Sequence, residues 1–377
     1  MKHPTPPSLA FLDDALADAR AKDLFRERAH PGPSLISFCS NDYLGLAQQT
    51  PPLEHAGAGA SRLVDGDRAI HARLEDACAA LVRQPAALVF TSGYTANVGL
   101  VSALAGPDDL LVSDALNHAS LIDGSRLSRA RIRVVPHLDV DAVDRALAEG
   151  PWRRAFVLTE SYFSMDADSP DLPALRRVCD RHGAALVVDE AHALGVLGPE
   201  GAGLCVGTGV QADAVVGTFG KAFGAGGAFV AGCPSLVSWL WNRARSFVFS
   251  TGLSPAVAAA ALQGMTTAAA EPDRRERTLA AATQLRRGLE SCGAHPLGTG
   301  HVVPWVLGDA GGALAMSRAL AERGFDVRAI RPPTVPAGTA RLRFTLSANH
   351  GNADIQRVVQ SVRAILSATS PAEPSGA

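Results

Sequence analysis

The centre of the chain reads Ala185-Leu186-Val187-Val188-Asp189-Glu190-Ala191-His192, an apolar run that ends on two acids and a histidine. Consecutive apolar residues without alternation are typical of a strand buried on both faces, as in a parallel sheet covered by helices. Ligands of such sheets collect outside the carboxyl ends of the strands. The stretch therefore predicts an α/β fold with a site at Asp189.

The same pattern extends from Ala86 to Val230, where short apolar runs alternate with amphipathic segments. This alternation predicts βαβ units and a mostly parallel sheet in a large central domain. Breakers stand where helices should stop, for example at Gly106-Pro107 and at His182-Gly183. The expected strands are 86–90, 110–113, 132–135, 155–159, 185–188, 214–217 and 228–231.

The composition of the sequence changes after Ser254, where residues 255–289 form a long Ala- and Arg-rich region that predicts helix. A β/α segment follows, with apolar runs at 302–307, 325–330 and 341–346 and a terminal helix at 353–366. We interpret this part as a smaller C-terminal α+β lobe. The predicted division is a short N-terminal segment (1–45), a large domain (46–268) and a small domain (269–377).

Composition excludes several classes of protein. The 377 residues include 35 Lys+Arg and 37 Asp+Glu, a net charge of −2, which argues against a strongly basic nucleic-acid binder. No apolar run approaches the ~18 residues of a membrane span. Asp13 and Asp14 interrupt the N-terminal apolar stretch, so we expect no secretory signal. The six cysteines lack metal-ligand or CxxC spacing and most have apolar neighbours, which predicts buried, reduced thiols, a cytoplasmic protein and no metal site.

A lone lysine follows another strand end, in Gly217-Thr218-Phe219-Gly220-Lys221. Its surroundings are almost free of charge, and a desolvated lysine readily becomes a neutral nucleophile that can form a Schiff base. Taken alone, a solvated lysine in a glycine loop is the more ordinary interpretation. The glycines at 224–227 let backbone approach a ligand closely or form a bulge.

Two further strand ends carry polar residues suited to a ligand. Gly93-Tyr94 opens a helix whose N–H groups suit a phosphate, although ordinary capping gives the same pattern. Asp189 could hold a ring nitrogen protonated. The Asp-Glu-Ala-His string also resembles a nucleotide-driven helicase, but the nearest phosphate loop, 217–222, has two residues rather than four between its glycines and Ala222 where Ser or Thr is needed.

Together, Gly93-Tyr94, Asp189, His192 and Lys221 have the spacing of a fold-type-I pyridoxal-phosphate transferase. The chain resembles the α-oxoamine synthase family over nearly its whole length, with the motifs in the family's order. The motifs are Asn41-Asp42-Tyr43-Leu44-Gly45-Leu46, Asn117-His118-Ala119-Ser120, Phe163-Ser164-Met165-Asp166, Asp189-Glu190-Ala191-His192 and Thr218-Phe219-Gly220-Lys221.

The resemblance implies pyridoxal 5'-phosphate (PLP) as cofactor and assigns three catalytic residues. Lys221 would hold the cofactor as a Schiff base and then remove the α-proton of the amino acid. Asp189 would pair with the pyridinium nitrogen, which keeps the ring an electron sink. His118 would stack on the ring and also face the substrate. The same resemblance places Gly93, Tyr94 and Thr218 on the phosphate, and Ser164 and His192 near the phenolic oxygen.

The resemblance also implies the substrates and an assembly. Residues 331–343 resemble members that join L-alanine to a pimeloyl thioester, on CoA or acyl carrier protein, with loss of CO₂. Arg343 would bind the amino-acid carboxylate with help from Asn41, and Arg26 and Thr334 would contact the acyl substrate. The family implies a homodimer, in which Thr251 would reach the partner's cofactor phosphate.

Other functions stay open at this stage. A sister acyltransferase would use glycine or another thioester. An aminotransferase of the same fold would share Lys221, Asp189 and Arg343 but release no CO₂. A cofactor-free binding module would not need Lys221, and a dehydrogenase would need a G-x-G-x-x-G in the first βα unit, which the sequence lacks.

Overall fold

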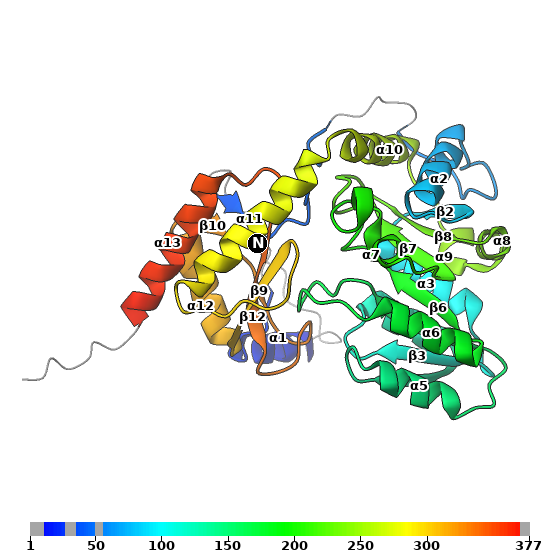
Figure 1. Ribbon diagram of the computed structural model, residues 1–377, viewed down its shortest axis with the longest axis horizontal. Helices are drawn as coiled ribbons and strands as arrows, with labels where there is room; N and C mark the ends of the chain where they lie inside the picture. The colour runs from blue at the N-terminus through cyan, green and yellow to red at the C-terminus, as the bar shows by residue number, and fades with distance from the viewer. Residues whose placement is uncertain (1–10, 27–34, 50–55, 370–377) are drawn as a thin grey trace, which may run out of the picture. The chain divides into compact units, whose positions relative to one another are not determined.

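The computed structural model describes residues 11–26, 35–49 and 56–369. The chain divides into two compact units, whose elements are labelled in Figure 1. The large unit comprises residues 41–279 and 347–349, and the small unit comprises residues 1–40, 280–346 and 350–377. Each unit has a hydrophobic core of its own.

This division differs from the predicted boundaries at 45/46 and 268/269. The N-terminal segment groups with the C-terminal residues because β1 (Ile36–Ser37) pairs in parallel with β10 (Phe325–Asp326). The other boundary falls inside a continuous helix, α11 (Asp273–Glu290). A pairing between residues far apart in sequence, such as β1 with β10, leaves no trace in local composition.

A seven-stranded sheet forms the centre of the large unit, in the order β2-β8-β7-β6-β5-β3-β4. Neighbouring strands from β7 to β4 are parallel, whereas β8 is antiparallel to both β2 and β7. The mostly parallel sheet is therefore confirmed, with each expected strand within one residue of its observed bounds. The strands are β2 (Ala86–Phe90), β3 (Leu110–Asp114), β4 (Arg131–Val135), β5 (Ala155–Glu160), β6 (Ala185–Asp189), β7 (Ala214–Thr218) and β8 (Ala228–Gly232).

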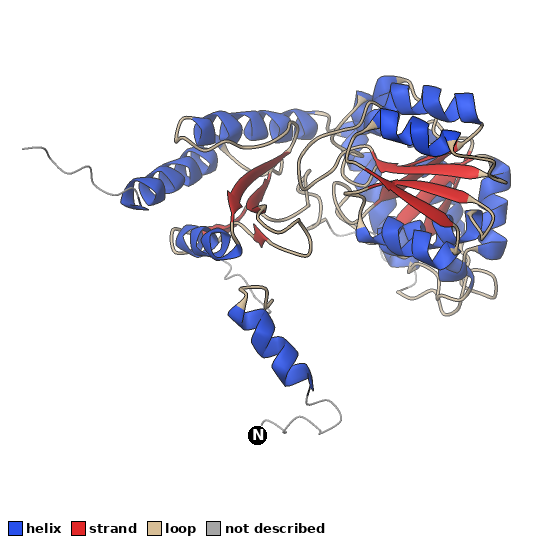
Figure 2. Cartoon of the chain, turned by 90° about the horizontal axis from the view of Figure 1, so that it is seen from below, coloured by secondary structure: helices blue, strands red, loops and turns tan. Residues whose placement is uncertain are grey.

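Helices cover both faces of this sheet, as Figure 2 shows. Successive residues of one strand point to opposite cores: Leu186 and Val188 face one core, and Val187 faces the other. The first core is closed by α2 (Ala69–Leu81), α5 (Val140–Ala148), α6 (Leu172–His182), α7 (Gly203–Thr208) and α10 (Pro255–Ala270). The second is closed by α3 (Gly93–Leu104), α4 (Ala119–Ser128), α8 (Pro234–Arg243) and α9 (Arg245–Val248).

Local capping explains where several helices begin and end. The side chains of Ser92, Asp139 and Asp171 each accept a backbone N–H in the first turn of α3, α5 and α6. Helix α6 ends at Gly183, whose φ of 62° places it in the left-handed region that favours glycine. The stop predicted at His182-Gly183 is confirmed.

The small unit contains a three-stranded antiparallel sheet in the order β11-β12-β9 and the parallel pair β1-β10. Its strands β9 (Val302–Gly308), β11 (Ala329–Ile330) and β12 (Ala340–Thr345) are accompanied by α12 (Ala310–Ala321), α13 (Asn352–Thr369) and α1 (Phe11–Ala21). Phe38, Leu285 and Phe344 are fully buried in its core. The predicted C-terminal α+β lobe is thus present.

Two predicted segments are divided in the structure. The helical region 255–289 is two helices, α10 and α11, that break at Glu271-Pro272 because proline lacks an N–H and clashes with a preceding turn. The apolar run 325–330 is two short strands, β10 and β11, which belong to different sheets. The hydrophobic pattern of the sequence continues across both breaks, so the pattern alone does not predict them.

The described residues contain no helix that is long and apolar enough to cross a membrane. They also contain no group of three or more His, Cys, Asp or Glu side chains that could hold a metal ion. All six cysteines are free, but the predicted burial holds only for Cys78, Cys179 and Cys205: Cys39 and Cys292 are half-buried, and Cys233 is exposed at the N-cap of α8.

One buried acid joins two neighbouring strands at the amino edge of the large sheet. Asp109, just before β3, has a fully buried side chain and accepts two hydrogen bonds each from Arg153 and Arg154, which precede β5. The backbone N–H of Gly106 adds a fifth, at 2.8 Å. Although burial opposes the charge, these donors hold the pKa of Asp109 well below its ordinary value.

We expect Asp109→Asn to lower the free energy of unfolding by about 2 kcal/mol, because the substitution leaves both guanidinium groups without their carboxylate. The contribution is fully present above pH 3.8, the ordinary pKa, and is lost as the pH falls through the lowered pKa. Urea unfolding at pH 7 and at decreasing pH measures it. Asp108→Asn, at the exposed neighbouring position, is the control, and equal midpoints for the two variants would contradict the assignment.

Candidate active site

Most of the predicted site residues lie in the large unit, at the carboxyl ends of its strands. Gly93 follows β2, His118 follows β3, Asp189 ends β6, and Lys221 follows β7. Because these strands are neighbours or near neighbours in the sheet, residues far apart in sequence come to one edge. The topology therefore places these four predicted residues where ligands of such sheets are expected to bind.

A chain of hydrogen bonds connects Asp189 to His118. Asn97, on α3, donates from its amide nitrogen to Oδ2 of Asp189 at 2.6 Å and to the hydroxyl of Ser120 at 2.9 Å. The Ser120 hydroxyl lies 2.7 Å from Nδ1 of His118. Asn97, Ser120 and Asp189 are all buried, and Oδ1 of Asp189 accepts from the backbone N–H of Ala191. The two predicted ring contacts are thus fixed relative to each other.

His118 caps the N-terminus of α4, where its Nδ1 accepts the backbone N–H of Ser120 at 3.2 Å. Burial lowers the pKa of His118 below its ordinary value; the positive charge of Lys221 acts in the same direction and Asp189 opposes it. The imidazole is therefore neutral at pH 7. Its own backbone N–H donates to Oε1 of Glu160, the last residue of β5, at 2.7 Å.

Glu160 adds a second buried acid to the site. Burial and the neighbouring Asp189 raise the pKa of its carboxyl, while Lys221 and the His118 N–H act against the rise. The positive charge of Lys221 thus lowers the pKa of both Glu160 and His118. Lys221 is half-buried, and its predicted position at the site is consistent with these interactions.

The loop after Lys221 packs against the turn formed by the Asn41–Leu46 motif. Gly224 has a φ of 64°, and a Cβ at this position would lie 2.4 Å from the carbonyl carbon of Leu46. A side chain at Gly224 would therefore separate the two loops. Glycine is required at position 224 because the backbone of this loop packs against the backbone of Leu46. The sequence had suggested instead that the glycines let the backbone approach a ligand.

Tyr43 links two of the predicted site residues. Its buried hydroxyl lies 2.7 Å from Nδ1 of His192 and 3.3 Å from Oδ1 of Asn41. The carbonyl of Tyr43 accepts from Thr278 and from the backbone N–H of Ala348. Asn41, at the start of the large unit, and His192, in the middle of its sequence, are thereby joined.

Gly93 and Thr218 border the same space. A Cβ at Gly93 would meet only Thr218, at 3.8 Å, so the N-terminus of α3 is open toward that hydroxyl. The first N–H groups of a helix have no partner within the helix, and the Ser92 side chain accepts that of Thr95. The side chain of Tyr94 is 46% exposed, and its hydroxyl donates to Asp123.

The remaining predicted residues of the large unit are Ser164 and Thr251. Ser164 is buried in a turn between Phe163 and Asp168, which pair as an isolated bridge. Thr251 is exposed in the segment after α9. The next residues bond to the Gly57–Arg62 segment: Gly252 N–H donates to the Ala60 carbonyl at 3.0 Å.

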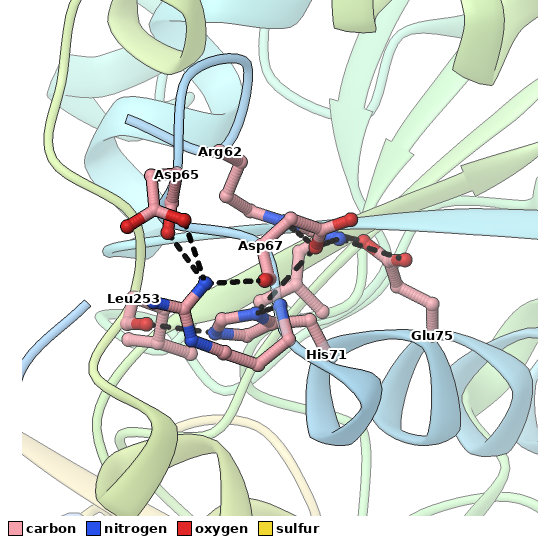
Figure 3. A network of polar contacts seen from close by, with 8 residues as sticks. Arg62, Asp65, Asp67, His71, Glu75 and Leu253 are labelled. Atoms are coloured by element: carbon pink, nitrogen blue, oxygen red, sulfur yellow. Dashed lines mark hydrogen bonds and ion pairs between the residues drawn. The ribbon is translucent and has the colours of Figure 1, made fainter. Parts of the chain in front are cut away.

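A polar network around the buried side chains of Arg62 and His71 reaches Leu253, two residues after Thr251 (Figure 3). Arg62 donates to Asp67 at 2.9 Å and also to Glu75, and its side chain is 3% exposed. Nδ1 of His71 accepts the backbone N–H of Arg68, so Nε2 carries the proton and donates to the Leu253 carbonyl at 2.8 Å. Burial lowers the pKa of His71, in agreement with a neutral ring.

Three predicted substrate residues lie in the small unit. The guanidinium of Arg26 donates to the Thr334 hydroxyl at 3.2 Å, so the two residues expected on the acyl substrate are neighbours. Arg343 is half-buried on β12, and Arg341, two residues earlier on the same strand, is buried. The role of Arg343 as carboxylate ligand remains a prediction.

Four residues of the site were not singled out from the sequence: Asn97, Ser120, Glu160 and Tyr43. Ser120 and Tyr43 belong to motifs quoted above, but nothing in a motif says which member bonds another motif. Asn97 and Glu160 carry a weak signal, a polar residue within an otherwise apolar helix face or at a strand end. Glu190 of the Asp-Glu-Ala-His string instead binds backbone N–H groups of Leu204 and Cys205 and the hydroxyl of Ser161.

The residues present fit a phosphorylated pyridine aldehyde such as PLP. Asp189 is a buried acceptor suited to a protonated ring nitrogen, and Lys221 is the primary amine that an aldehyde requires. The open helix N-terminus at Gly93, beside the Thr218 hydroxyl, suits a dianionic phosphate. Neutral His118 can lie against an aromatic ring without adding charge.

Comparisons with known proteins agree with this arrangement. The family model for aminotransferase class I and II matches residues 33–362. An 8-amino-7-oxononanoate synthase from Anaeromyxobacter sp. (strain K) is 48% identical, covering 91% of this chain and 89% of the relative. A solved structure described as SPT with a PLP internal aldimine has a TM-score of 0.89 and 29% identity, covering 96% of this chain and 99% of that one.

A second solved structure, an 8-amino-7-oxononanoate synthase from Francisella tularensis, has a TM-score of 0.77 and 27% identity, covering 89% of this chain and 99% of that one. PLP is the cofactor to which the family match, the PLP-bound neighbour and the site all point. The chain belongs to the aminotransferase class I and II family and, within it, to the group of 8-amino-7-oxononanoate synthases.

Proposed function

We propose that this chain is a cytoplasmic enzyme of biotin biosynthesis that joins L-alanine to a pimeloyl thioester. The products are 8-amino-7-oxononanoate, CO₂ and the free thiol of the carrier, which is CoA or acyl carrier protein. The observation that carries the proposal is 48% identity to an 8-amino-7-oxononanoate synthase across 91% of the chain. The buried side chains of Asp189, Asn97 and Ser120, with His118 bonded to Ser120, supply a site in keeping with it.

PLP supplies an aldehyde that condenses with the amino group and a ring that accepts the electrons released at Cα. Asp189 holds a proton on the ring nitrogen, since a buried carboxylate favours the charged form of a cationic neighbour. Asn97 keeps Asp189 in one orientation through the 2.6 Å hydrogen bond. Because Asn97 cannot ionise, it fixes the carboxylate without competing for that proton.

Lys221 acts as the base that takes the α-proton of the amino acid onto Nζ. The Lys221 amine must be neutral when it accepts this proton. The nearby His118 imidazole is also neutral, so it does not repel the positive charge that Lys221 gains with the proton. His118 would contact the face of the ring and the substrate. Ser164 and His192 bind the phenolic oxygen, and the Tyr43 hydroxyl, 2.7 Å from Nδ1 of His192, fixes the orientation of the imidazole.

Gly93, Tyr94 and Thr218 bind the phosphate, Gly93 and Tyr94 through backbone N–H groups at the start of α3. Arg343 and Asn41 bind the carboxylate of the amino acid, and Arg26 and Thr334 contact the acyl group. The guanidinium of Arg343 is a planar donor suited to a carboxylate. We propose a homodimer in which Thr251 contacts the cofactor phosphate of the partner subunit.

A sister activity has one observation in its favour. The solved structures described as SPT superpose with TM-scores up to 0.89, against 0.77 for the Francisella tularensis synthase. A TM-score measures the similarity of the backbone alone, whereas 48% identity means that many side chains are shared as well. We therefore place L-alanine first and test the other amino acids beside it.

The function is tested with PLP-loaded enzyme, pimeloyl-CoA and L-alanine, glycine or L-serine in turn. We expect release of free thiol, CO₂ and 8-amino-7-oxononanoate with L-alanine only. Thiol and CO₂ release that is faster with glycine or L-serine would move the chain to a sister acyltransferase. Exchange of amino and keto acids without CO₂ would indicate an aminotransferase and would overturn the proposal.

The attachment of the cofactor can be tested sharply because the chain has only three lysines, Lys2, Lys22 and Lys221. Borohydride reduction of the PLP-loaded protein, followed by peptide mapping, is expected to fix the cofactor on Lys221. Lys221→Ala should abolish turnover and this attachment. Lys22→Ala, which removes an exposed lysine paired with Asp18, is the matched control and should change neither.

Asn97→Ala tests the orientation of Asp189. The variant frees a carboxylate that the cofactor must then order, so we expect roughly ten-fold weaker PLP binding and a comparable loss of kcat. Absorbance titration of the apoprotein and steady-state rates measure both. Asn242→Ala removes an exposed asparagine that bonds only a carbonyl of its own helix, and it should behave as the parent. Equal PLP affinities for both variants would show that Asn97 does not orient Asp189.

A further inference from the structure

His137 contacts two turns at the carboxyl edge of the large sheet. Its Nδ1 lies 2.9 Å from Oδ1 of Asp114, and its Nε2 lies 3.2 Å from Oδ2 of Asp168. The ring also packs edge-on against Phe163, with centroids 4.6 Å apart and an interplanar angle of 88°. Ionised carboxylates only accept hydrogen bonds, so both ring nitrogens carry protons and His137 is an imidazolium.

Asp114 begins the turn that ends at His118. It is the last residue of β3, its side chain is buried, and it accepts the backbone N–H groups of Leu116 at 2.8 Å and Leu138 at 2.9 Å. One carboxylate therefore bonds the strand end, the turn toward His118 and the segment that contains His137. A shift of Asp114 would move the backbone that leads to His118.

Asp168 closes the turn that contains Ser164. The backbone N–H of Phe163 donates to the Asp168 carbonyl at 2.9 Å, and that of Ala167 donates to the Phe163 carbonyl at 2.7 Å. His137 contacts both ends of this turn, the Asp168 carboxylate and the Phe163 ring. The position of Ser164 therefore depends on a turn whose two ends meet at one imidazole.

The charges around His137 favour a cationic side chain at this position. Although burial opposes the charge, Asp114 and Asp168 raise the pKa of His137 to about 10. The imidazolium thus stays charged through the neutral range and compensates two carboxylates. Without that charge, Asp114 and Asp168 would repel each other in a partly buried place, and the turns would separate.

We propose that His137 is a positioning residue of the active site, which holds the turn of His118 against the turn of Ser164. The roles of His118 on the cofactor ring and of Ser164 on its phenolic oxygen rest on the proposed function. His137 is expected to touch neither cofactor nor substrate. It acts by fixing, through one charged ring, two backbone segments that come from different strands.

The test uses two variants that each keep half of the contact. The amide nitrogen of His137→Asn replaces Nδ1 and can bond Asp114, whereas that of His137→Gln replaces Nε2 and can bond Asp168. Neither amide carries the charge or bridges the two turns as the ring does. His182→Gln is the matched control, since His182 bonds Asp144 through Nε2 at 2.6 Å on the surface of the same unit.

Four quantities are measured on each full-length variant: the PLP dissociation constant, the absorbance maximum of the bound cofactor, kcat and KM for the amino acid, and the unfolding midpoint of the apoprotein. We expect both His137 variants to bind PLP about ten-fold more weakly, with a displaced absorbance maximum. We expect kcat to fall about ten- to a hundred-fold, with a smaller change in KM. The control should match the parent throughout.

A purely structural His137 would lower the unfolding midpoint and leave the other quantities unchanged, which would overturn the proposal. If the His137 variants do not fold, Asp168→Asn decides, because it keeps the size of the side chain and removes one charge of the cluster. Parental PLP affinity and absorbance in Asp168→Asn would then contradict the proposal. PLP affinity and absorbance need no substrate, so failure of the proposed reaction leaves this test interpretable.

Discussion

A carboxylate buried at the end of a buried strand is the constraint on which the arrangement of the large unit depends. An ionised Asp189 in this position is costly unless its oxygens are hydrogen-bonded. The backbone N–H of Ala191 bonds one oxygen, and Asn97 bonds the other. Since Asn97 also bonds Ser120, the acid ties α3 and α4 to β6, and the position of His118 follows.

The same large sheet treats acids differently at its two edges. At the amino edge, Asp109 is neutralised by two arginines that are half exposed, so the arrangement serves stability and keeps its charges in contact with water. At the carboxyl edge, Asp114, Glu160, Asp189 and Glu190 meet amides, hydroxyls and a single imidazolium. At Asp189 the donors are neutral, an amide and a backbone N–H, so they orient the carboxylate without cancelling its charge and leave it able to hold a proton on a bound cation.

Strands and the approximate location of the site could be predicted, because unbroken apolar runs such as 185–188 mark strands buried on both faces. The same local patterns gave the stop of α6 at Gly183. Pairing could not be predicted in this way: β1 joins β10 across the whole chain, and the run 325–330 serves two sheets. The hydrogen bond between Asn97 and Asp189 also depends on a tertiary contact between α3 and the end of β6. The local pattern of a single sequence does not predict such contacts.

The antiparallel strand β8 sets the order in which the large sheet can be completed. In sequence β2 is the first strand of the sheet, yet its neighbour in the sheet is β8, the last strand to be synthesised. Until residue 232 has left the ribosome, β2 and the helix start at Gly93 have no strand to join. Gly93 meets Thr218 only when β8 lies between β2 and β7. During synthesis, Asp189 and Lys221 are therefore both present before the space between Gly93 and Thr218 can form. The proposed phosphate-binding end of the large sheet can therefore form only after β8 has joined β2 and β7, and contacts between residues so far apart in sequence close slowly.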